Sequence, residues 1–325
     1  MDLKEGPLFK VYLHKLSNHE HLFTIIKHHV IADGWSSGIM LEDLSKMYNA
    51  YIKGESITLF KAAQLSDYAL EQARFKLTKT YQSTEDFWLN LYKDQVPVVD
   101  LPTDFPRTSP RSYKGMRMDH PISKELLEQL KSRGAKVGGS LVTTLLAAFE
   151  VFLYAKTKQE NLVVGLPASG QAASGLFDVV GHCVNLLPLK TTIDKNLSFS
   201  AYLKKRKNEV LDAYDHQRLT FGELIKKLYI QRDSARITLV PVIFNIDMGM
   251  DQQVRFDGIE HKLTSNPRAY ESFDLYLNAT GSKNGAILEW SFNTGLFEPE
   301  TIRAYHQDFH TMLEKIASNP EIAIA

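Results

Sequence analysis

Cysteine is almost absent from this 325-residue sequence, which contains only Cys183. A lone cysteine excludes an intramolecular disulfide framework and a zinc site built from cysteine ligands. Net charge is also missing, because 38 basic residues balance 38 acidic ones. A neutral chain has no basic footprint for nucleic acid and no polybasic patch for a membrane surface. We therefore expect neither nucleic acid nor a membrane among its partners.

Long hydrophobic runs are missing as well. The longest apolar stretch, from Leu141 to Tyr154, contains Glu150 and is too short for a transmembrane helix. The first residues, from Met1 to Pro7, lack the apolar core of a secretory signal. We expect a soluble protein that works in the cytoplasm. Hydrophobic residues make up 44% of the chain, enough for a sizeable core. At about 100–200 residues per domain, the length predicts two domains or lobes.

Strand and helix patterns alternate irregularly along the chain. Residues 8–16 and 22–29 are typical of two strands in a hairpin with a polar turn between them. Further strands are expected at 162–166, 179–193, 239–246, 255–263, 273–280 and 286–292. Helices are expected at 37–51, 65–81, 84–92, 123–133, 140–154, 198–214, 220–229 and 298–316. This mixture, without strict βαβ alternation, predicts an α+β fold, a mixed α/β sandwich with helices packed on sheets.

Proline and glycine mark two irregular segments. Four prolines between Pro97 and Pro110 exclude a helix interior, so we interpret this segment as the connector between two lobes. Small residues from Pro167 to Gly175 predict a loop. This loop is not a phosphate-binding loop, because no Gly-Lys-Ser/Thr sequence ends it.

A short motif follows the second expected strand. It reads His-His-Val-Ile-Ala-Asp-Gly over residues 28–34 and continues as Trp-Ser-Ser. Gly34 permits backbone angles that a side chain forbids, and Ser36 or Ser37 can cap the next helix. Histidine titrates near neutral pH, and helix N–H groups can face a developing oxyanion, so these parts suit acyl transfer. The spacing alone leaves a structural or surface role open.

The His-His-x-x-x-Asp-Gly-Trp-Ser segment resembles the core motif of condensation domains of nonribosomal peptide synthetases. These domains belong to the chloramphenicol-acetyltransferase-like superfamily. Further segments resemble the family's motifs and stand in the family's order: 65–72, 180–190, 216–224 and 232–245. The Gly-His-Cys-Val-Asn-Leu-Leu-Pro segment at 181–188 is similar to condensation domains found beside polyketide modules. Together the similarities span most of the chain.

This resemblance implies two chloramphenicol-acetyltransferase-like lobes in a V, with the histidine motif at the base of the groove between them. The family's early strand and helices have no counterpart here, so the first lobe, 1–105, is expected to be incomplete. The second lobe is expected at 106–325. The implied partners are donor and acceptor carrier proteins and adjacent synthetase modules. No cofactor is expected to be bound, since the carriers deliver their substrates on 4'-phosphopantetheine arms.

The resemblance also implies an acyltransferase of secondary metabolite biosynthesis. A carrier-bound aminoacyl amine would attack a carrier-bound acyl or peptidyl thioester and form an amide bond. His29 would deprotonate or orient the amine, and His28 would support the site. Asp33 would hold the loop in shape, and the Gly34 N–H would lie near the thioester carbonyl. The implied substrate-binding residues are Trp35, Ser36 and Asn185. No metal site is expected.

The sequence departs from the family pattern at one position, and several alternative functions stay open. Related domains often have an arginine where this chain has Gln171, so the partner of Asp33 stays open. We interpret His182 and His216 as structural, and Cys183 as a buried strand residue rather than a nucleophile. A related enzyme stays open, either an epimerisation domain or an acyltransferase with a small acyl donor. A truncated, non-catalytic remnant that serves as a docking platform for carriers also stays open.

Overall fold

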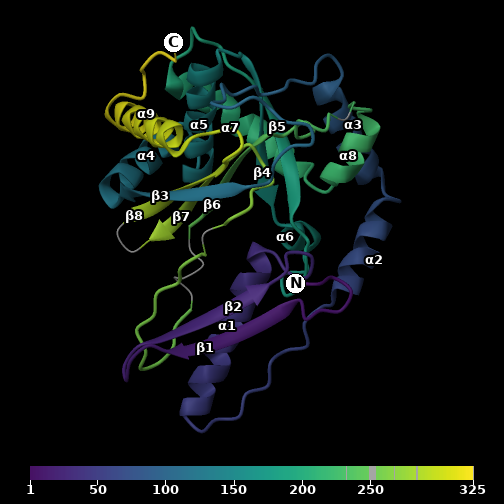
Figure 1. The fold of residues 1–325 in the computed structure, drawn as a ribbon. Helices are drawn as coiled ribbons and strands as arrows, with labels where there is room; N and C mark the ends of the chain where they lie inside the picture. Colours follow the sequence, from purple (N-terminus) through teal and green to yellow (C-terminus); the bar gives the residue numbers. More distant parts are fainter. Residues whose placement is uncertain (232, 249–253, 267, 283–284, 325) are drawn as a thin grey trace. The chain divides into compact units, whose positions relative to one another are not determined.

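The computed structural model of the chain describes residues 1–231, 233–248, 254–266, 268–282 and 285–324 (Figure 1). These residues form two compact units. The described residues of the first unit are 1–78, 169–184 and 254–262. The second unit contains the other described residues. Each unit therefore combines segments that are distant in the sequence.

The compact units follow packing, and they differ from a division of the chain after residue 105. Helix α3 (Lys79–Tyr92) belongs to the second unit. Its Trp88 and Tyr92 side chains lie in the hydrophobic core of that unit. The Tyr92 hydroxyl also donates a hydrogen bond to the Pro188 carbonyl, at 2.6 Å. The division into lobes 1–105 and 106–325 stays a prediction from the family resemblance.

The first unit contains a two-stranded antiparallel sheet of β1 (Phe9–Lys15) and β2 (His21–Lys27). Its register places Leu13 opposite Phe23. The predicted hairpin is therefore confirmed. All side chains of β1 are exposed, although several of them are apolar.

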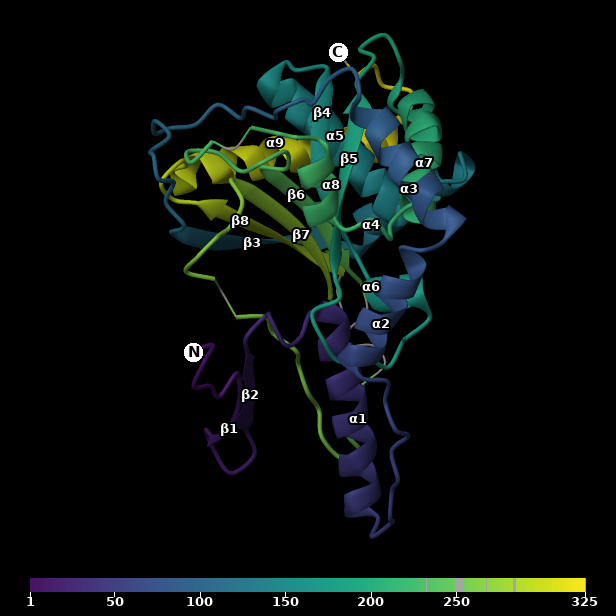
Figure 2. The same cartoon turned by 90° about the vertical axis from the view of Figure 1, so that its right-hand side faces the viewer.

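Three helices belong to the first unit: α1 (Gly34–Ile52), α2 (Leu65–Phe75) and α6 (Gly170–Ser174). Helix α2 lies beside α6 (Figure 2). The sequence predicted a loop where α6 forms. That prediction was wrong because the Ser169 hydroxyl accepts a hydrogen bond from the Ala172 N–H and so caps a short helix.

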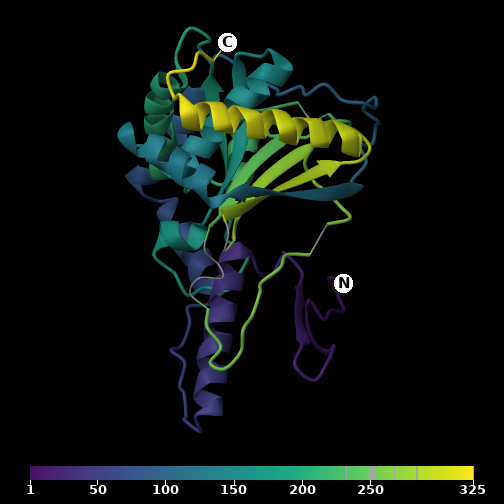
Figure 3. The same ribbon diagram turned by 90° about the vertical axis from the view of Figure 1, so that its left-hand side faces the viewer.

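Residues 254–262 run alongside α1 (Figure 3). The Asn49 side chain of α1 donates to the Arg255 carbonyl and accepts from the Asp257 N–H, both at 2.8 Å. The strand expected at 255–263 is not present, and the described residues there form only an isolated bridge between Phe256 and Ile259. The backbone groups next to this bridge bind Asn49 instead of a neighbouring strand.

The second unit is built on a six-stranded sheet with the strand order β3-β8-β7-β6-β4-β5. Its strands are β3 (Gly115–Ser123), β4 (Asn161–Ala168), β5 (Asn185–Thr192), β6 (Val242–Asp247), β7 (Leu275–Ser282) and β8 (Gly285–Asn293). Strand β6 pairs in parallel with β4 and β7, and the other pairs are antiparallel. The predicted mixed sheet is therefore confirmed. Arg232, in one of the family-like segments, lies outside the described residues.

Strand β3 was not predicted. Its sequence contains Pro121 and several polar residues, which weaken the strand signal. The strand lies at the edge of the sheet, where a proline that cannot donate a ladder hydrogen bond is tolerated. Its hydrogen-bonding partners lie in β8, far along the chain, where for example Leu288 is opposite His120.

The remaining helices of the second unit are α4 (Lys124–Lys136), α5 (Leu141–Thr157), α7 (Phe199–Asp215), α8 (Phe221–Lys227) and α9 (Pro299–Ser318). Four of them begin at a hydroxyl that accepts a hydrogen bond from a first-turn N–H: Ser123, Ser140, Ser198 and Thr220. Side-chain capping of this kind is local, so these starts agree with the sequence to within one residue.

Several helix boundaries differ from the prediction. The pattern predicted one helix over 65–81, but α2 ends at Phe75 and α3 begins at Lys79. Thr84, the expected cap of the next helix, lies inside α3 and is buried. Helix α4 also continues past Gly134.

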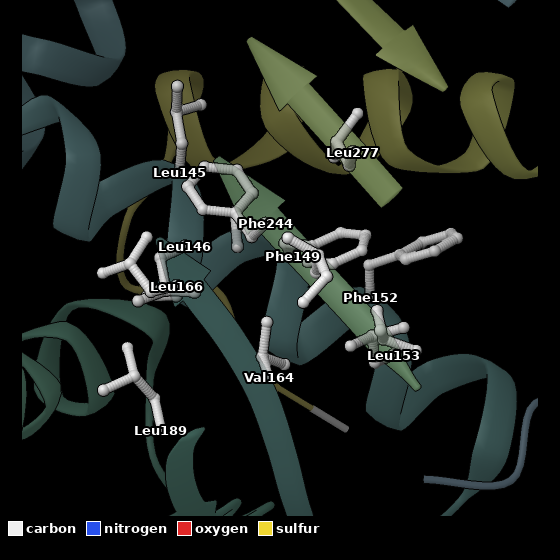
Figure 4. Packing of buried hydrophobic residues seen from close by; sticks show 14 of the residues in the cluster. Leu145, Leu146, Phe149, Phe152, Leu153, Val164, Leu166, Leu189, Phe244 and Leu277 are labelled. Atoms are coloured by element: carbon white, nitrogen blue, oxygen red, sulfur yellow. The ribbon is translucent and has the colours of Figure 1, made fainter. Parts of the chain in front are cut away.

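The core of the second unit lies between the sheet and its helices. Phe149 and Phe152 of α5 pack near Phe244 of β6 (Figure 4). Phe149 and Phe152 also contact Trp290 edge-on, with ring centroids 6.2 and 5.9 Å away. Each fully buried aromatic or aliphatic side chain stabilises the fold by roughly 1.5–3 kcal/mol. This cluster holds the sheet and α5 in one body.

Among the described residues, no single helix is long and apolar enough to cross a membrane. Helices α4 and α5 together have the length and composition of a membrane span, but only as a pair that is bent by 97°.

Candidate active site

The histidine motif forms the loop between β2 and α1. The loop begins with a turn, in which the Ile31 N–H donates to the His28 carbonyl at 3.1 Å. The His28 ring is half-buried, and its Nδ1 accepts a hydrogen bond from the Val30 N–H at 3.1 Å. Lys27, the last residue of β2, donates from its Nζ to the hydroxyl of Ser37 in the first turn of α1, at 2.6 Å. His28 therefore binds its own loop, and Lys27 ties the end of the strand to the first turn of the helix.

Asp33 is the centre of this loop. Its side chain is buried, and its carboxylate accepts hydrogen bonds from the Ser36 N–H at 2.9 Å and the Ser36 hydroxyl at 2.7 Å. The N–H groups of Cys183 and Val184 donate to its Oδ2 at 3.0 and 3.1 Å. Burial alone would raise the pKa of Asp33, but these hydrogen bonds and one from Gln171 outweigh it and lower the pKa. Asp33 is therefore held as a carboxylate.

Gln171 is the partner of Asp33 that the sequence left open. Its amide Nε2 lies 3.2 Å from Asp33 Oδ1 and 3.1 Å from Oδ2, and its side chain is fully buried. A neutral amide thus occupies the place of the expected ion-pair partner. Because Gln171 carries no charge, the backbone donors described above supply much of the stabilisation of the carboxylate.

The hydrogen bonds to Asp33 explain two wrong predictions. Residues 179–184 were expected to be the first part of a strand, but β5 begins only at Asn185. The N–H groups of Cys183 and Val184 point at the carboxylate, so they are not available to a sheet. The cap of α1 was expected at Ser36 or Ser37, but Asp33 is the N-cap and the helix begins at Gly34.

The predicted substrate-binding residues of the motif have different environments. Ser36 is fully buried, and its hydroxyl lies 2.7 Å from Asp33 Oδ1 and 2.9 Å from the Gly181 carbonyl. It also accepts a hydrogen bond from the Gly181 N–H at 3.0 Å. Trp35 is 40% exposed, and its Nε1 donates to the Phe177 carbonyl at 2.8 Å. Ser36 thus binds protein groups, whereas the Trp35 ring presents an open face.

Gly34 is the first residue of α1 and is exposed. It does not have a positive φ, so the wider backbone freedom of a glycine is not used at this position. A Cβ atom at this position would meet nothing within 4 Å. The missing side chain instead leaves the start of the helix uncovered, where the N–H groups of Gly34 and Trp35 have no partner within the helix. These groups carry the positive end of the helix dipole.

His29 lies near the start of the loop, two residues after the end of β2, and its side chain is exposed. Its Nδ1 lies 3.0 Å from Nδ1 of His182, with the two rings nearly perpendicular at 82°. The sequence placed His182 among structural residues and missed this contact. Its position in the family-like segment 180–190, next to Cys183, was the available signal. His216 lies in the second unit, where its ring stacks on Phe87.

Asn185 stands at the start of β5 in the second unit. Its Nδ2 donates to the carbonyls of Gln217 and Leu219, both at 2.8 Å. Its Oδ1 accepts from the Phe221 N–H at 2.9 Å. The amide therefore holds the segment before α8, and a substrate contact by Asn185 stays a prediction. The described residues contain no group of three or more His, Cys, Asp or Glu side chains that could hold a metal ion.

This geometry agrees with what comparison with known families shows. The family model of the condensation domain matches residues 1–325. The chain belongs to the condensation domain family. Tyrocidine synthase 3 of Brevibacillus parabrevis is 33% identical over 326 residues, covering 100% of this chain and 5% of that protein. Surfactin synthase subunit 2 of Bacillus subtilis (strain 168) is 32% identical over 324 residues, covering 100% of this chain and 9% of that protein.

This condensation domain thus spans less than a tenth of the length of these two curated relatives. Among solved structures, it resembles the condensation domain from the Monacolin K polyketide synthase MokA with a TM-score of 0.88. The match covers 100% of this chain and 75% of that chain at 19% sequence identity. The expected chloramphenicol-acetyltransferase-like, mixed α/β fold is therefore confirmed.

Proposed function

We propose that this condensation domain joins an acceptor amine to a donor acyl group. Both groups would be thioesters on 4'-phosphopantetheine arms of carrier proteins, with no cofactor bound to the domain itself. The amine nitrogen attacks the donor thioester carbonyl, a C–N bond forms and the C–S bond breaks. The amine proton passes to the departing thiolate. The net result is one amide and one free pantetheine thiol.

His29 is the residue to which we assign the proton transfer. The observation that carries this assignment is the geometry around Asp33, whose buried carboxylate fixes the loop while the His29 ring stays exposed. A neutral imidazole is available as a base near neutral pH. His28 would support His29 through its bond to the loop backbone.

The start of α1 would bind the developing negative charge. The N–H groups of Gly34 and Trp35 have no partner within the helix, and Gly34 carries no side chain to block an approaching carbonyl oxygen. The exposed face of Trp35 would contact the substrate. Ser36 would act through Asp33, because its hydroxyl is buried and bound to protein groups. Asn185 remains a proposed substrate contact.

The partners we propose are a donor carrier, an acceptor carrier and neighbouring synthetase modules. The length of the curated relatives, of which this chain spans 5% and 9%, supports a multidomain context. A location in the cytoplasm, expected from the sequence, is also part of this proposal.

The test is a coupled assay followed by intact-mass analysis. The full chain is mixed with a donor acyl-carrier and an acceptor aminoacyl-carrier. The mass of the carrier that holds the condensed product is then measured. We expect His29→Ala to lower the rate of product formation by at least about 100-fold, as loss of a general base does. The matched control is His19→Ala, since His19 is an exposed histidine outside the motif.

Carrier binding separates catalysis from docking. We expect His29→Ala to bind both carriers as the unchanged protein does, measured by calorimetry. Equal product from the unchanged protein and His29→Ala would refute the role of His29. Carrier binding without product, in the unchanged protein, would instead favour the docking platform.

A further inference from the structure

The contact between His29 and His182 is a direct one between ring nitrogens. Their Nδ1 atoms are 3.0 Å apart, and the ring centroids are 4.8 Å apart in an edge-to-face arrangement. Two imidazole nitrogens at this distance share one proton, so one ring donates and the other accepts. The tautomer of His29 is therefore coupled to that of His182.

The backbone on both sides of His182 is bound to the motif. The Gly181 N–H donates to the Ser36 hydroxyl at 3.0 Å, and the Cys183 N–H donates to Asp33 Oδ2 at 3.0 Å. The same carboxylate caps α1 and closes the loop that carries His29. Both histidines thus project from backbone held by one buried network. Both side chains are exposed, but the backbone that carries each of them is fixed, so the network holds the two rings in reach of one another.

We propose that His182 is a positioning residue for His29, accepting its Nδ1–H and so leaving its Nε2 free to take a proton from the substrate amine. This inference rests on the proposed function. When Nε2 receives the proton, His29 becomes an imidazolium, and its Nδ1–H still points at the His182 lone pair. That hydrogen bond becomes charge-assisted and therefore stronger at the moment when positive charge forms. A carboxylate orients and stabilises the histidine of a serine-protease triad in the same sense.

The electrostatics keep His182 in the neutral form that this role requires. Burial lowers the pKa of His182, and the neighbouring His29 lowers it further. The Asp33 carboxylate and the His29 backbone act in the opposite direction, but they do not reverse the shift. Protonation of His182 at Nδ1 would bring two N–H groups into contact across the 3.0 Å gap. The proton from the substrate amine is therefore taken up at Nε2 of His29.

The first test is the protonation pattern of His29 in solution, which needs no activity. Nitrogen NMR of the full chain labelled with 15N-histidine should show His29 protonated at Nδ1 and bare at Nε2 at pH 8. In His182→Ala, we expect the His29 signals to shift toward the tautomer protonated at Nε2. His19→Ala, at an exposed position outside the network, is the matched control and should leave His29 unchanged. A His29 ring that carries its proton on Nε2 in the unchanged protein would overturn the proposal.

The second test is kinetic. We expect His182→Ala to lower kcat by about 10- to 100-fold, with KM changed less than twofold, because the variant loses an orienting partner and no substrate contact. His182→Asn keeps an acceptor oxygen near the Nδ1 position and should recover most of the lost kcat. Urea unfolding should give similar midpoints for all three proteins. A His182→Ala enzyme with unchanged kcat would refute the positioning role.

The two tests separate this inference from the proposed function. If His29 has the expected tautomer but no protein forms amide, the proposed reaction fails and the positioning role stands. If His29→Ala is inactive while His182→Ala keeps the full rate, the reaction stands and the positioning role fails.

Discussion

The amide of Gln171 donates to both carboxylate oxygens of Asp33, at 3.2 Å to Oδ1 and 3.1 Å to Oδ2. The two residues are 138 positions apart in the chain, and both side chains are buried. This pair joins the start of α1 to helix α6 within the first unit. A neutral residue here avoids the desolvation of a second charge, which a buried arginine would require.

Removal of this amide should destabilise the first unit. In Gln171→Ala, the Asp33 carboxylate stays buried with one donor fewer, so we expect a loss of about 1–3 kcal/mol of unfolding free energy. Urea unfolding followed by circular dichroism measures it. The matched control is Gln82→Ala, because the exposed Gln82 also donates to an aspartate, Asp86, at 3.1 Å. We expect the control to change stability by less than about 0.5 kcal/mol. Equal effects of both substitutions would contradict this account.

The single thiol should be unreactive in the folded chain. Burial, and then the nearby Asp33 carboxylate, raise the pKa of Cys183 from 9.0 to about 11. The thiolate fraction at pH 8 is then about 100-fold smaller than for an ordinary cysteine. A colorimetric thiol reagent should therefore label the native protein slowly and the urea-unfolded protein fast. Ser17→Cys adds an exposed thiol and should react fast without urea. Rapid native labelling of Cys183 would contradict the burial seen here.

The buried ion pair of the second unit should be costly to break. Arg206 Nη2 lies 2.7 Å from Glu150 Oε1, and both side chains are almost completely buried. Arg206→Leu removes the charged partner of the Glu150 carboxyl and leaves only the hydrogen bond from the Tyr202 hydroxyl, so we expect a loss of about 3–5 kcal/mol. The double variant Glu150→Leu with Arg206→Leu should recover much of that loss. Thermal and urea unfolding of the three proteins provide the measurement.

An exposed pair serves as the control for the buried one. Arg303 and Glu300 of α9 form a 2.6 Å ion pair with both side chains more than half exposed. We expect Arg303→Leu to cost less than about 1 kcal/mol. A cost equal to that of Arg206→Leu would show that burial is not the deciding factor.

His306 should make the second unit sensitive to mild acid. The ring of His306 stacks on that of His120, with the ring centroids 3.9 Å apart. Burial, followed by the charges of His120 and His310, lowers the pKa of His306 from 6.5 to about 4. The unfolded chain then binds a proton that the folded chain rejects. The contribution of the neutral His306 ring to the free energy of unfolding is fully present above pH 6.5. It is lost as the pH falls from 6.5 toward 4.

The variant His306→Phe keeps a ring in the stack and removes the titration. We expect its urea midpoint to fall less than that of the unchanged protein between pH 7.5 and pH 5. Because the ring is partly exposed, solvent screens the effect, and the difference should be on the order of 1 kcal/mol. His19→Phe, in the exposed hairpin turn, should keep the original pH dependence. Parallel pH profiles of the unchanged protein and His306→Phe would contradict the prediction.

The sequence by itself determined the features that depend on neighbouring residues. The hairpin of β1 and β2 follows from two apolar runs and a short polar turn. The starts of α5, α7 and α8 follow from Ser140, Ser198 and Thr220, whose hydroxyls reach N–H groups only three residues away. The motif at 28–34, with the other family-like segments, was sufficient to predict the condensation domain family.

The tertiary structure decided the features that depend on residues far apart in the chain. Strand β3 forms because β8 supplies its ladder partners, which no local pattern contains. The end of the segment 179–184 is not a strand, because Asp33 accepts hydrogen bonds from the N–H groups of Cys183 and Val184. His29 meets His182 across 153 positions, so no pattern of spacing could pair them. Local hydrogen bonds can be predicted from sequence, but a buried carboxylate selects its donors only once the chain has folded around it.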